Sequence, residues 1–200
     1  MTGNNDRIES MNRDLWSADE FGTVLGAAKS GADWAWRRLV EAYSPSLLGY
    51  ARLRGAAEPE DVLSEVWMAA ATGIHRFDGD EPGFRSWLFV IAHRRAIDAG
   101  RKKARRPQLA DLVSVDELPH RSTTSAESMA LDIISTEQID ELLSHLTLDQ
   151  RTVIALRVIA DLSLEETARI LGKRIGAVKA LQHRALEALR QQIEPPSVSP

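Results

Sequence analysis

The sequence predicts an all-α fold in which two small helical domains are joined by an acidic, flexible linker. Apolar residues recur at the three- and four-residue spacing of a helix on both sides of position 107. Several of these segments begin with Ser or Thr followed three residues later by Glu or Gln, which is the pattern of a helix-capping box. Between them, residues 108–134 combine many acids with few aromatics and no apolar stripe, as a linker does.

The composition indicates a cytoplasmic protein without disulfides or metal. The 200 residues are 44% hydrophobic and 27% charged, enough for one large domain or two small ones. We find no run of eighteen apolar residues and no export signal. Cysteine is absent, and the five histidines lack the spacing of metal ligands. We therefore expect no membrane span, no cofactor and no metal site.

The net charge of -4 conceals two basic segments. Residues 94–106 carry seven Arg or Lys against one acid, and residues 173–190 carry five against one. Local charge, not the total, sets the potential that a phosphate backbone meets, so both segments are candidates for binding nucleic acid. For the first segment, a solvated basic helix end is an equally good interpretation on charge alone.

The first domain is expected to span residues 16–107, after a loose polar tail at 1–15. Its first helix begins with a capping box formed by Ser17 and Glu20, and a second is capped by Asp33. Glycines follow the first and third helices, where the chain must turn. The predicted helices cover residues 17–31, 33–43, 45–54, 58–71 and 84–106.

The fourth predicted helix has an acidic face. Proline and acids occupy its first turn at 58–61, where proline loses no hydrogen bond and negative charge meets the positive end of the helix. Apolar residues line one side, and the other side carries Asp61, Ser64, Glu65 and Met68. This face suggests a protein partner, although composition alone slightly favours a plain solvated surface.

The fifth predicted helix joins a core stripe to a basic end. Apolar residues from Phe84 to Ile91 have the spacing of a helix buried along one side, and basic residues replace them from Arg94 onward. A helix that leaves the core with this charge is suited to phosphates. In the glycine-rich loop before it, Phe77 could stack on a base, although such a Phe more often plugs its own domain.

The second domain is expected at residues 135–192, followed by a tail at 193–200. Capping boxes at Thr147 and Ser163 open two of its helices. The predicted helices cover about 139–146, 147–159, 163–172 and 176–192.

The last two predicted helices have the pattern of a helix-turn-helix. Ala168 is small enough for close helix contact, Gly172 lies where the chain must turn, and Val178 and Leu181 can anchor the second helix across the first. The second helix then presents basic residues outward, and such a unit fits the major groove of DNA. An ordinary helical hairpin with a basic face is the alternative interpretation.

Two motif sets, in order and with an acidic linker between them, resemble those of an extracytoplasmic-function (ECF) sigma factor. This group IV, primary-sigma-like family directs bacterial RNA polymerase to promoters. The similar segments are EDVLSEVW (60–67) and FRSWLFVIAHRRAID (84–98) in the first domain, and LTLDQRTVIALRVIADLSLEETARILG (146–172) and GAVKALQHRALEALR (176–190) in the second.

The resemblance implies that the first domain binds the clamp coiled coil of core RNA polymerase and the -10 element of promoter DNA. The second domain would read the -35 element in the major groove and sit on the polymerase flap, and an anti-sigma protein could bind across both. The resemblance assigns to the polymerase Asp61, Ser64, Glu65, Trp67 and Met68. It assigns to the -10 element Phe77, Asp80, Phe84, Arg85, Trp87, Arg94, Arg95, Arg101, Lys102, Lys103 and Arg105. It assigns to the -35 element Lys173, Arg174, Ala177, Lys179, Ala180, His183 and Arg184.

Five positions depart from the family pattern. Arg94 stands where Asn is usual, at the expected base pocket, and Ser64 replaces a usual Gln in the polymerase-binding helix. Thr147 replaces a proline that opens the second domain. Ala177 and Ala180 replace hydroxyl residues common in the recognition helix. The -10 and -35 sequences that this chain prefers are therefore left open.

Two rival functions differ in class. A helix-turn-helix regulator that acts as a dimer without a sigma role would explain residues 146–190 but not the aromatic and basic helix at 84–106. An enzyme would need positioned acids, bases or nucleophiles, and the sequence has no phosphate-binding glycine loop, HExxH motif or Ser/His/Asp signature. We expect a protein without catalytic residues or a small-molecule substrate.

Overall fold

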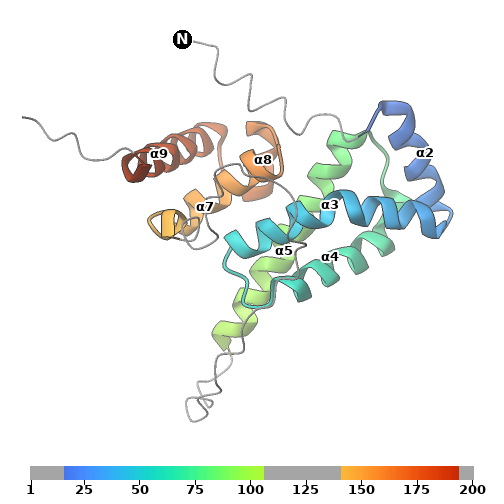
Figure 1. Ribbon diagram of the computed structural model, residues 1–200, viewed down its shortest axis with the longest axis horizontal. Coiled ribbons are helices and arrows are strands. Elements are labelled where there is room, and N and C mark those ends of the chain that lie inside the picture. Colours follow the sequence, from blue (N-terminus) through green and yellow to red (C-terminus); the bar gives the residue numbers. More distant parts are fainter. Residues whose placement is uncertain (1–15, 106–140, 194–200) are drawn as a thin grey trace, which may run out of the picture.

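The computed structural model describes residues 16–105 and 141–193, and within these ranges it contains helices and no strand (Figure 1). The predicted all-α class is confirmed for this part of the chain. The predicted linker and both predicted tails lie outside the described residues. None of the described helices is long and apolar enough to cross a membrane.

The first domain contains four α-helices and one short 3-10 turn. A capping box starts the first helix: the Ser17 amide donates to Glu20 Oε2 at 3.1 Å, and the Glu20 amide donates to Ser17 Oγ at 3.3 Å. Gly31 and Gly55 have φ angles of 82° and 80°, which glycine adopts without steric cost, so both predicted turns are confirmed. The elements are α2 (Ala18–Lys29), α3 (Asp33–Leu53), α4 (Pro59–Gly73), η1 (Ile74–Arg76) and α5 (Glu81–Arg105).

α3 is one continuous helix where the sequence predicted two. Pro45 lies inside it and has no amide to donate, so a break was expected there. The helix continues because Tyr43 and Leu47, on either side of the proline, share one face and are both buried in the core. The predicted cap at Asp33 is also wrong, since Ala32 occupies the N-cap position and no side chain caps the helix.

α5 packs on α3 and α4 and supplies much of the core. Phe84 and Leu88 are fully buried as predicted, and so is Phe89, which the predicted stripe omitted. Trp87 and Ile91 are only half-buried. The buried face of α5 therefore differs from the predicted one, since Phe89 packs edge to face against Tyr50 on α3.

The second domain begins, among the described residues, with a helical segment at 141–144 and then shows the predicted helix-turn-helix. Thr147 and Ser163 form capping boxes with Gln150 and Glu166. Gly172 ends the first helix of the motif with a left-handed φ of 61°. The elements are α7 (Leu148–Ile154), a π-helical turn η2 (Ala155–Ile159), α8 (Leu164–Leu171) and α9 (Ile175–Ile193).

Side chains tie the pieces of this domain together. Val153, Ala168 and Val178 form a small core where α8 meets α9, and the predicted anchor Val178 is fully buried. The guanidinium of Arg157, in the π-helical turn, donates to the Leu162 carbonyl and, at 3.3 Å, to Gln182 Oε1 on α9. The loop after η2 is thus bonded to α9.

The two domains pack against each other along α3 and α5, an arrangement that the sequence left open. Figure 1 shows α7, α8 and α9 grouped on one side of α3, with α2 at the opposite end. Ala155, Leu156, Ala160 and Leu162 belong to the same buried cluster as the core of the first domain. α3 approaches η2 so closely that a Cβ atom at Gly49 would lie 3.7 Å from Ile159 Cγ2.

Candidate nucleic-acid and protein interfaces

α4 presents the acidic face predicted from the sequence. Val62 and Val66 are buried on its inner side, whereas Asp61 and Ser64 are exposed on the outer side. Met68 on the same outer side is 63% exposed. An exposed apolar group beside acids is suited to contact with another protein.

Two further residues of the predicted polymerase-binding set connect α4 to its own domain. Trp67 is half-buried, and its indole Nε1 donates to Ser44 Oγ on α3 at 3.0 Å. The Glu65 carboxylate lies 3.9 Å from Arg95 Nη1 on α5, with both side chains partly exposed. A long and partly exposed ion pair is weak, so Glu65 can exchange this partner for another at little cost.

The loop before α5 is organised by aromatic packing. The ring centroid of Phe77 lies 5.3 Å from that of Phe84 and 5.4 Å from that of Trp87. The exposed Asp80 caps α5, since its Oδ1 accepts the Gly83 amide at 2.9 Å. Phe77 thus plugs its domain, as the alternative interpretation proposed, and its contact with a base stays a prediction.

Phe84 and Arg85 follow this loop and are both buried. Phe84 packs against the rings of Phe21 and Tyr43 at centroid distances of 5.5 and 5.6 Å. The Phe84 ring would have to leave the core in order to touch DNA. The surroundings of Phe84 therefore support a role in packing the core of the first domain.

Arg85 lies between two carboxylates and is 9% exposed. Its Nη2 and Nε atoms bind the Glu81 carboxylate at 2.5 and 3.1 Å, and its Nη1 binds Asp161 Oδ2, in the second domain, at 3.1 Å. The Tyr43 hydroxyl donates to Glu81 Oε1 at 2.7 Å. Burial alone would lower the pKa of Arg85, but the bonds to Glu81 and then to Asp161 outweigh it and raise that pKa, so the guanidinium stays charged.

Farther along α5, the basic face reaches solvent. Arg94 and Arg101 are exposed and Arg95 is half-buried. Asp98, the alternative partner proposed for Arg94, lies 3.9 Å from Arg101 Nη1. The side chains of the other predicted DNA contacts on this helix, Lys102, Lys103 and Arg105, lie outside the described residues.

α9 presents most of its predicted DNA-reading residues to solvent. Val178 and Ala185 are fully buried and orient the helix. The Lys173 ammonium, just before α9, binds Asp149 Oδ2 on α7 at 2.9 Å and is only partly exposed. The residues that the helix exposes are Ala177, Lys179, Ala180, His183 and Arg184, and Arg174 is exposed in the turn before it.

Residues 39–106 match the family model of Sigma-70 region 2, and residues 136–189 match that of Sigma-70 region 4. The chain is also 33% identical over 183 residues to the ECF RNA polymerase sigma factor SigD of Mycobacterium tuberculosis (strain ATCC 25618 / H37Rv), covering 88% of this chain and 84% of SigD. The chain belongs to the ECF sigma factors. It directs promoter-specific initiation of transcription by RNA polymerase.

Two further comparisons agree with this assignment. The ECF sigma factor ShbA of Streptomyces griseus is 33% identical over 189 residues, covering 88% of this sigma factor and 98% of ShbA. Among solved structures, the sigma factor RpoE in complex with the anti-sigma factor NepR from Bartonella quintana is 25% identical, with a TM-score of 0.60. This structural match covers 78% of this chain and 95% of the RpoE chain.

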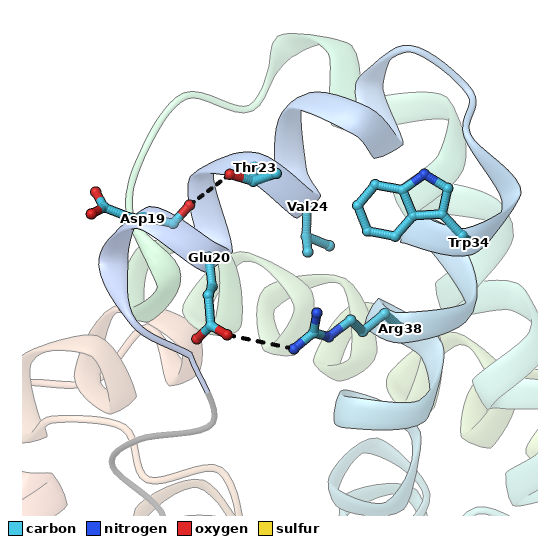
Figure 2. Close-up of a pocket in the computed structure, with 6 residues that line it drawn as sticks. All are labelled: Asp19, Glu20, Thr23, Val24, Trp34 and Arg38. Carbon is cyan, nitrogen blue, oxygen red and sulfur yellow. Dashed lines mark hydrogen bonds and ion pairs between the residues drawn. The ribbon is translucent and has the colours of Figure 1, made fainter.

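The sigma family makes the protein an initiation factor and not an enzyme. Figure 2 shows a surface pocket between α2 and α3. It has a volume of about 240 Å³ and contains one ion pair, Glu20 with Arg38 at 3.8 Å, but none of the predicted site residues. Its lining residues are Asp19, Glu20, Thr23, Val24, Trp34 and Arg38. Within residues 16–105 and 141–193 no cluster of three potential metal ligands occurs.

The main feature that the sequence did not predict is the link between regions 2 and 4 of this sigma factor. Asp161 and Glu81 showed no distinctive pattern, since each is an acid between two predicted helices. The bond between Asp161 and Arg85 joins positions 76 residues apart along the chain. The one unusual property of Asp161 is its positive φ of 49°, and a sequence does not show backbone angles.

Proposed function

We propose that this sigma factor binds its partners through the exposed faces of α4, α5 and α9. Region 2 binds the clamp coiled coil of core polymerase through α4, and binds the -10 element through α5 and the loop before it. Region 4 binds the -35 element through α9 and sits on the polymerase flap. The observation that carries this proposal is the separation of charge: α4 exposes acids, whereas α5 and α9 expose arginine and lysine.

Within region 2, the exposed residues contact the partners directly and the buried ones support them. Asp61, Ser64, Glu65 and Met68 meet the polymerase, and Trp67 holds α4 against α3 through Ser44. On the DNA side, Arg94, Arg95 and Arg101 are near enough to the surface to reach phosphates, with Lys102, Lys103 and Arg105 beyond them. Phe77, Phe84 and Trp87 hold the loop that carries Asp80 in place.

The complex with NepR supports a third partner. RpoE, which shares this fold, was crystallised with an anti-sigma factor. We infer that an anti-sigma protein also binds this chain, across both regions. Since its polymerase and promoters are cytoplasmic, the chain acts there. The boundaries 16–107 and 135–192 stay a prediction, which light proteolysis would test by cutting between residues 108 and 134.

Paired double variants test the charge assignment. Lys179→Ala with Arg184→Ala should weaken promoter binding by the holoenzyme and lower the slope of log K against log salt by about two, since each phosphate contact releases about 0.9 counterion. Core polymerase binding should be unchanged. Asp61→Ala with Glu65→Ala should weaken core binding and leave the salt slope of preassembled holoenzyme as it was.

The matched control is Arg37→Ala with Arg52→Ala, which removes two exposed charges from α3 outside both faces. It should change neither measurement. Equal loss of core binding in the α4 and α9 double variants would show that the two faces are not specialised, and the assignment would fail.

A further inference from the structure

The C-terminal end of α3 carries an arginine without a carboxylate partner. Arg54 caps the helix, directly before the left-handed turn at Gly55. Its side chain is half-buried, and its Nε atom is almost inaccessible to solvent and has no hydrogen-bond partner among the described residues. None of the ion pairs found within residues 16–105 and 141–193 includes Arg54. A guanidinium that is partly desolvated and unpaired is suited to an external anion.

The side of α3 that carries Arg54 faces α5. Tyr50 lies one turn before Arg54 on α3 and is fully buried. Its ring packs edge to face on Phe89 of α5 at a centroid distance of 5.6 Å, and its hydroxyl lies 2.6 Å from His93 Nδ1. Residues four positions apart share a helix face, so Arg54 extends the line of contact that begins at Tyr50. Arg54 is therefore close to the part of α5 around His93.

The charge of Arg54 acts on both partners of the bond between Tyr50 and His93. Burial raises the pKa of the Tyr50 phenol, and the charge of Arg54 opposes that rise. Burial, followed by the charge of Arg54, lowers the pKa of His93 to about 4, so the imidazole is neutral at physiological pH. With a cation beside the phenol oxygen, the Tyr50 hydroxyl donates to Nδ1, and the imidazole proton is on Nε2. His93 thus keeps one N–H donor for a further partner.

α5 continues this positive surface. His93, Ile97 and Arg101 are four residues apart and form one row along the helix. The Arg101 side chain, at the end of the row, is 71% exposed, and Arg94 next to His93 is also exposed. Asp98 is the one acid between residues 82 and 105. The row therefore leads from the contact with Tyr50 into the basic face of α5, and Arg54 adds a charge at its edge.

We propose that Arg54 and His93 together bind one backbone phosphate of promoter DNA, so that the end of α3 extends the DNA-binding surface of α5. The inference rests on the proposed binding of the -10 element by α5. Arg54 supplies a charge and guanidinium donors from α3, and His93 supplies a neutral Nε2–H donor from α5. The pair offers donors and no free acceptor, which suits phosphate oxygens and not a base edge that needs both.

A contact of this kind orients the protein without reading sequence. Phosphate contacts fix the register of a protein on DNA, and contacts to base edges give specificity. Because the two donors come from different helices, a bound phosphate would hold the end of α3 and the middle of α5 in one position relative to the DNA. The contact therefore sets where the exposed arginines of α5 lie along the DNA.

Promoter binding by the holoenzyme at a series of salt concentrations tests the pair. Arg54→Ala should weaken binding at least threefold and lower the slope of log K against log salt by about one, since one phosphate contact is lost. Arg54→Lys keeps the charge and should keep the slope. His93→Phe removes a neutral donor, so it should weaken binding at least twofold and leave the slope unchanged. Binding of core polymerase should be the same for all three variants.

A role in stability alone has a different signature. A cation at the C-terminal end of a helix interacts favourably with the last carbonyl groups, so Arg54 could simply stabilise α3. Arg54→Ala would then lower the melting temperature and leave the salt slope unchanged. Arg54→Gln is longer but uncharged, and it should reduce the slope as Arg54→Ala does. It replaces Arg54→Ala if that variant does not fold.

Two further variants separate this inference from the proposed function. The matched control is Arg52→Ala, on the same helix, because Arg52 is 60% exposed and binds Glu60 at 2.9 Å. It should change neither affinity nor slope. Arg101→Ala reports on α5 itself and should lower the slope by about one. An unchanged slope for Arg101→Ala would overturn the DNA-binding role of α5 and the pair with it. A normal result for Arg101→Ala with an unchanged slope for Arg54→Ala and Arg54→Gln would overturn the pair alone.

Neutral methylphosphonates, introduced one at a time into the promoter backbone, locate the contact. At the phosphate that the pair binds, the neutral group should weaken binding by wild type and by Arg52→Ala at least threefold. The same group should have little effect on Arg54→Ala, because a contact that is already lost cannot be lost twice. A set of phosphates among which none shows this coupling to Arg54, or an affinity unaffected by His93→Phe, would overturn the proposal.

Discussion

Removing the charge of Arg85 should destabilise the folded chain far more than removing any exposed arginine. Arg85→Met keeps a long, flexible side chain in the same space and leaves the Glu81 and Asp161 carboxylates without their cation. The side chains of these two acids are only 12% and 24% exposed, so water replaces the lost partner poorly. Breaking one side of such a buried pair costs about 3–5 kcal/mol. For a chain of this size that corresponds to a fall in melting temperature of roughly 6–20 °C.

Calorimetry or thermal denaturation followed by circular dichroism measures the change. Arg101→Met is the matched control, since its side chain is 71% exposed and lies 3.9 Å from Asp98. It should change the melting temperature by no more than about 4 °C, because exposed pairs contribute at most about 1 kcal/mol. Adding Asp161→Asn to Arg85→Met should recover part of the loss, because one unpaired carboxylate disappears. Equal melting temperatures for the Arg85 and Arg101 variants would refute this account of the network.

Two other predictions concern α5. His93 lies 2.6 Å from the Tyr50 hydroxyl, and burial, followed by the charge of Arg54, lowers its pKa to about 4. The imidazole of the unfolded chain therefore binds a proton more readily than that of the folded chain. As the pH drops from 6.5 to 4, the free energy of unfolding should fall by up to about 2 kcal/mol, discounted for partial exposure. His93→Phe should flatten the dependence of this free energy on pH over that range, and an unchanged slope would exclude His93 as its source. Arg94→Asn should shift base preference at a single -10 position by roughly ten- to a hundredfold in transcription from a randomised library, because Arg has five donors and no acceptor where Asn has both; an identical base profile would leave Arg94 with no part in reading the base.

Local patterns predicted the helices and their ends well. The capping boxes at Ser17, Thr147 and Ser163 depend on residues three positions apart, and all three form as predicted. The left-handed turn at Gly172 was equally local. The helix break predicted at Pro45 was wrong because the effect of a proline depends on the residues on either side of it. The burial of Tyr43 and Leu47 on one face of α3 outweighs the missing hydrogen bond.

The candidate interfaces were predicted well where the spacing of charged residues shows which side of a helix is exposed. They were predicted less well where contacts between distant parts of the chain bury a residue. The exposed face of α9 and the outer side of α4 follow directly from spacing. The spacing predicted Phe84 to be a core residue and the family motif assigned it to DNA, and the structure shows it buried. Arg85 was assigned to DNA by the same motif, and nothing in that motif indicates that it is buried. Burial of Arg85 depends on Asp161, and a single sequence does not pair residues so far apart.

The bonds of Arg157 have a mechanical consequence for region 4. Its guanidinium donates both to the Leu162 carbonyl, next to Asp161, and to Gln182 on α9. These bonds connect the loop after η2 rigidly to α9. Replacing Arg157 should therefore loosen the loop and α9 together. The orientation of the helix proposed to bind DNA thus depends on a residue that lies outside the helix-turn-helix itself.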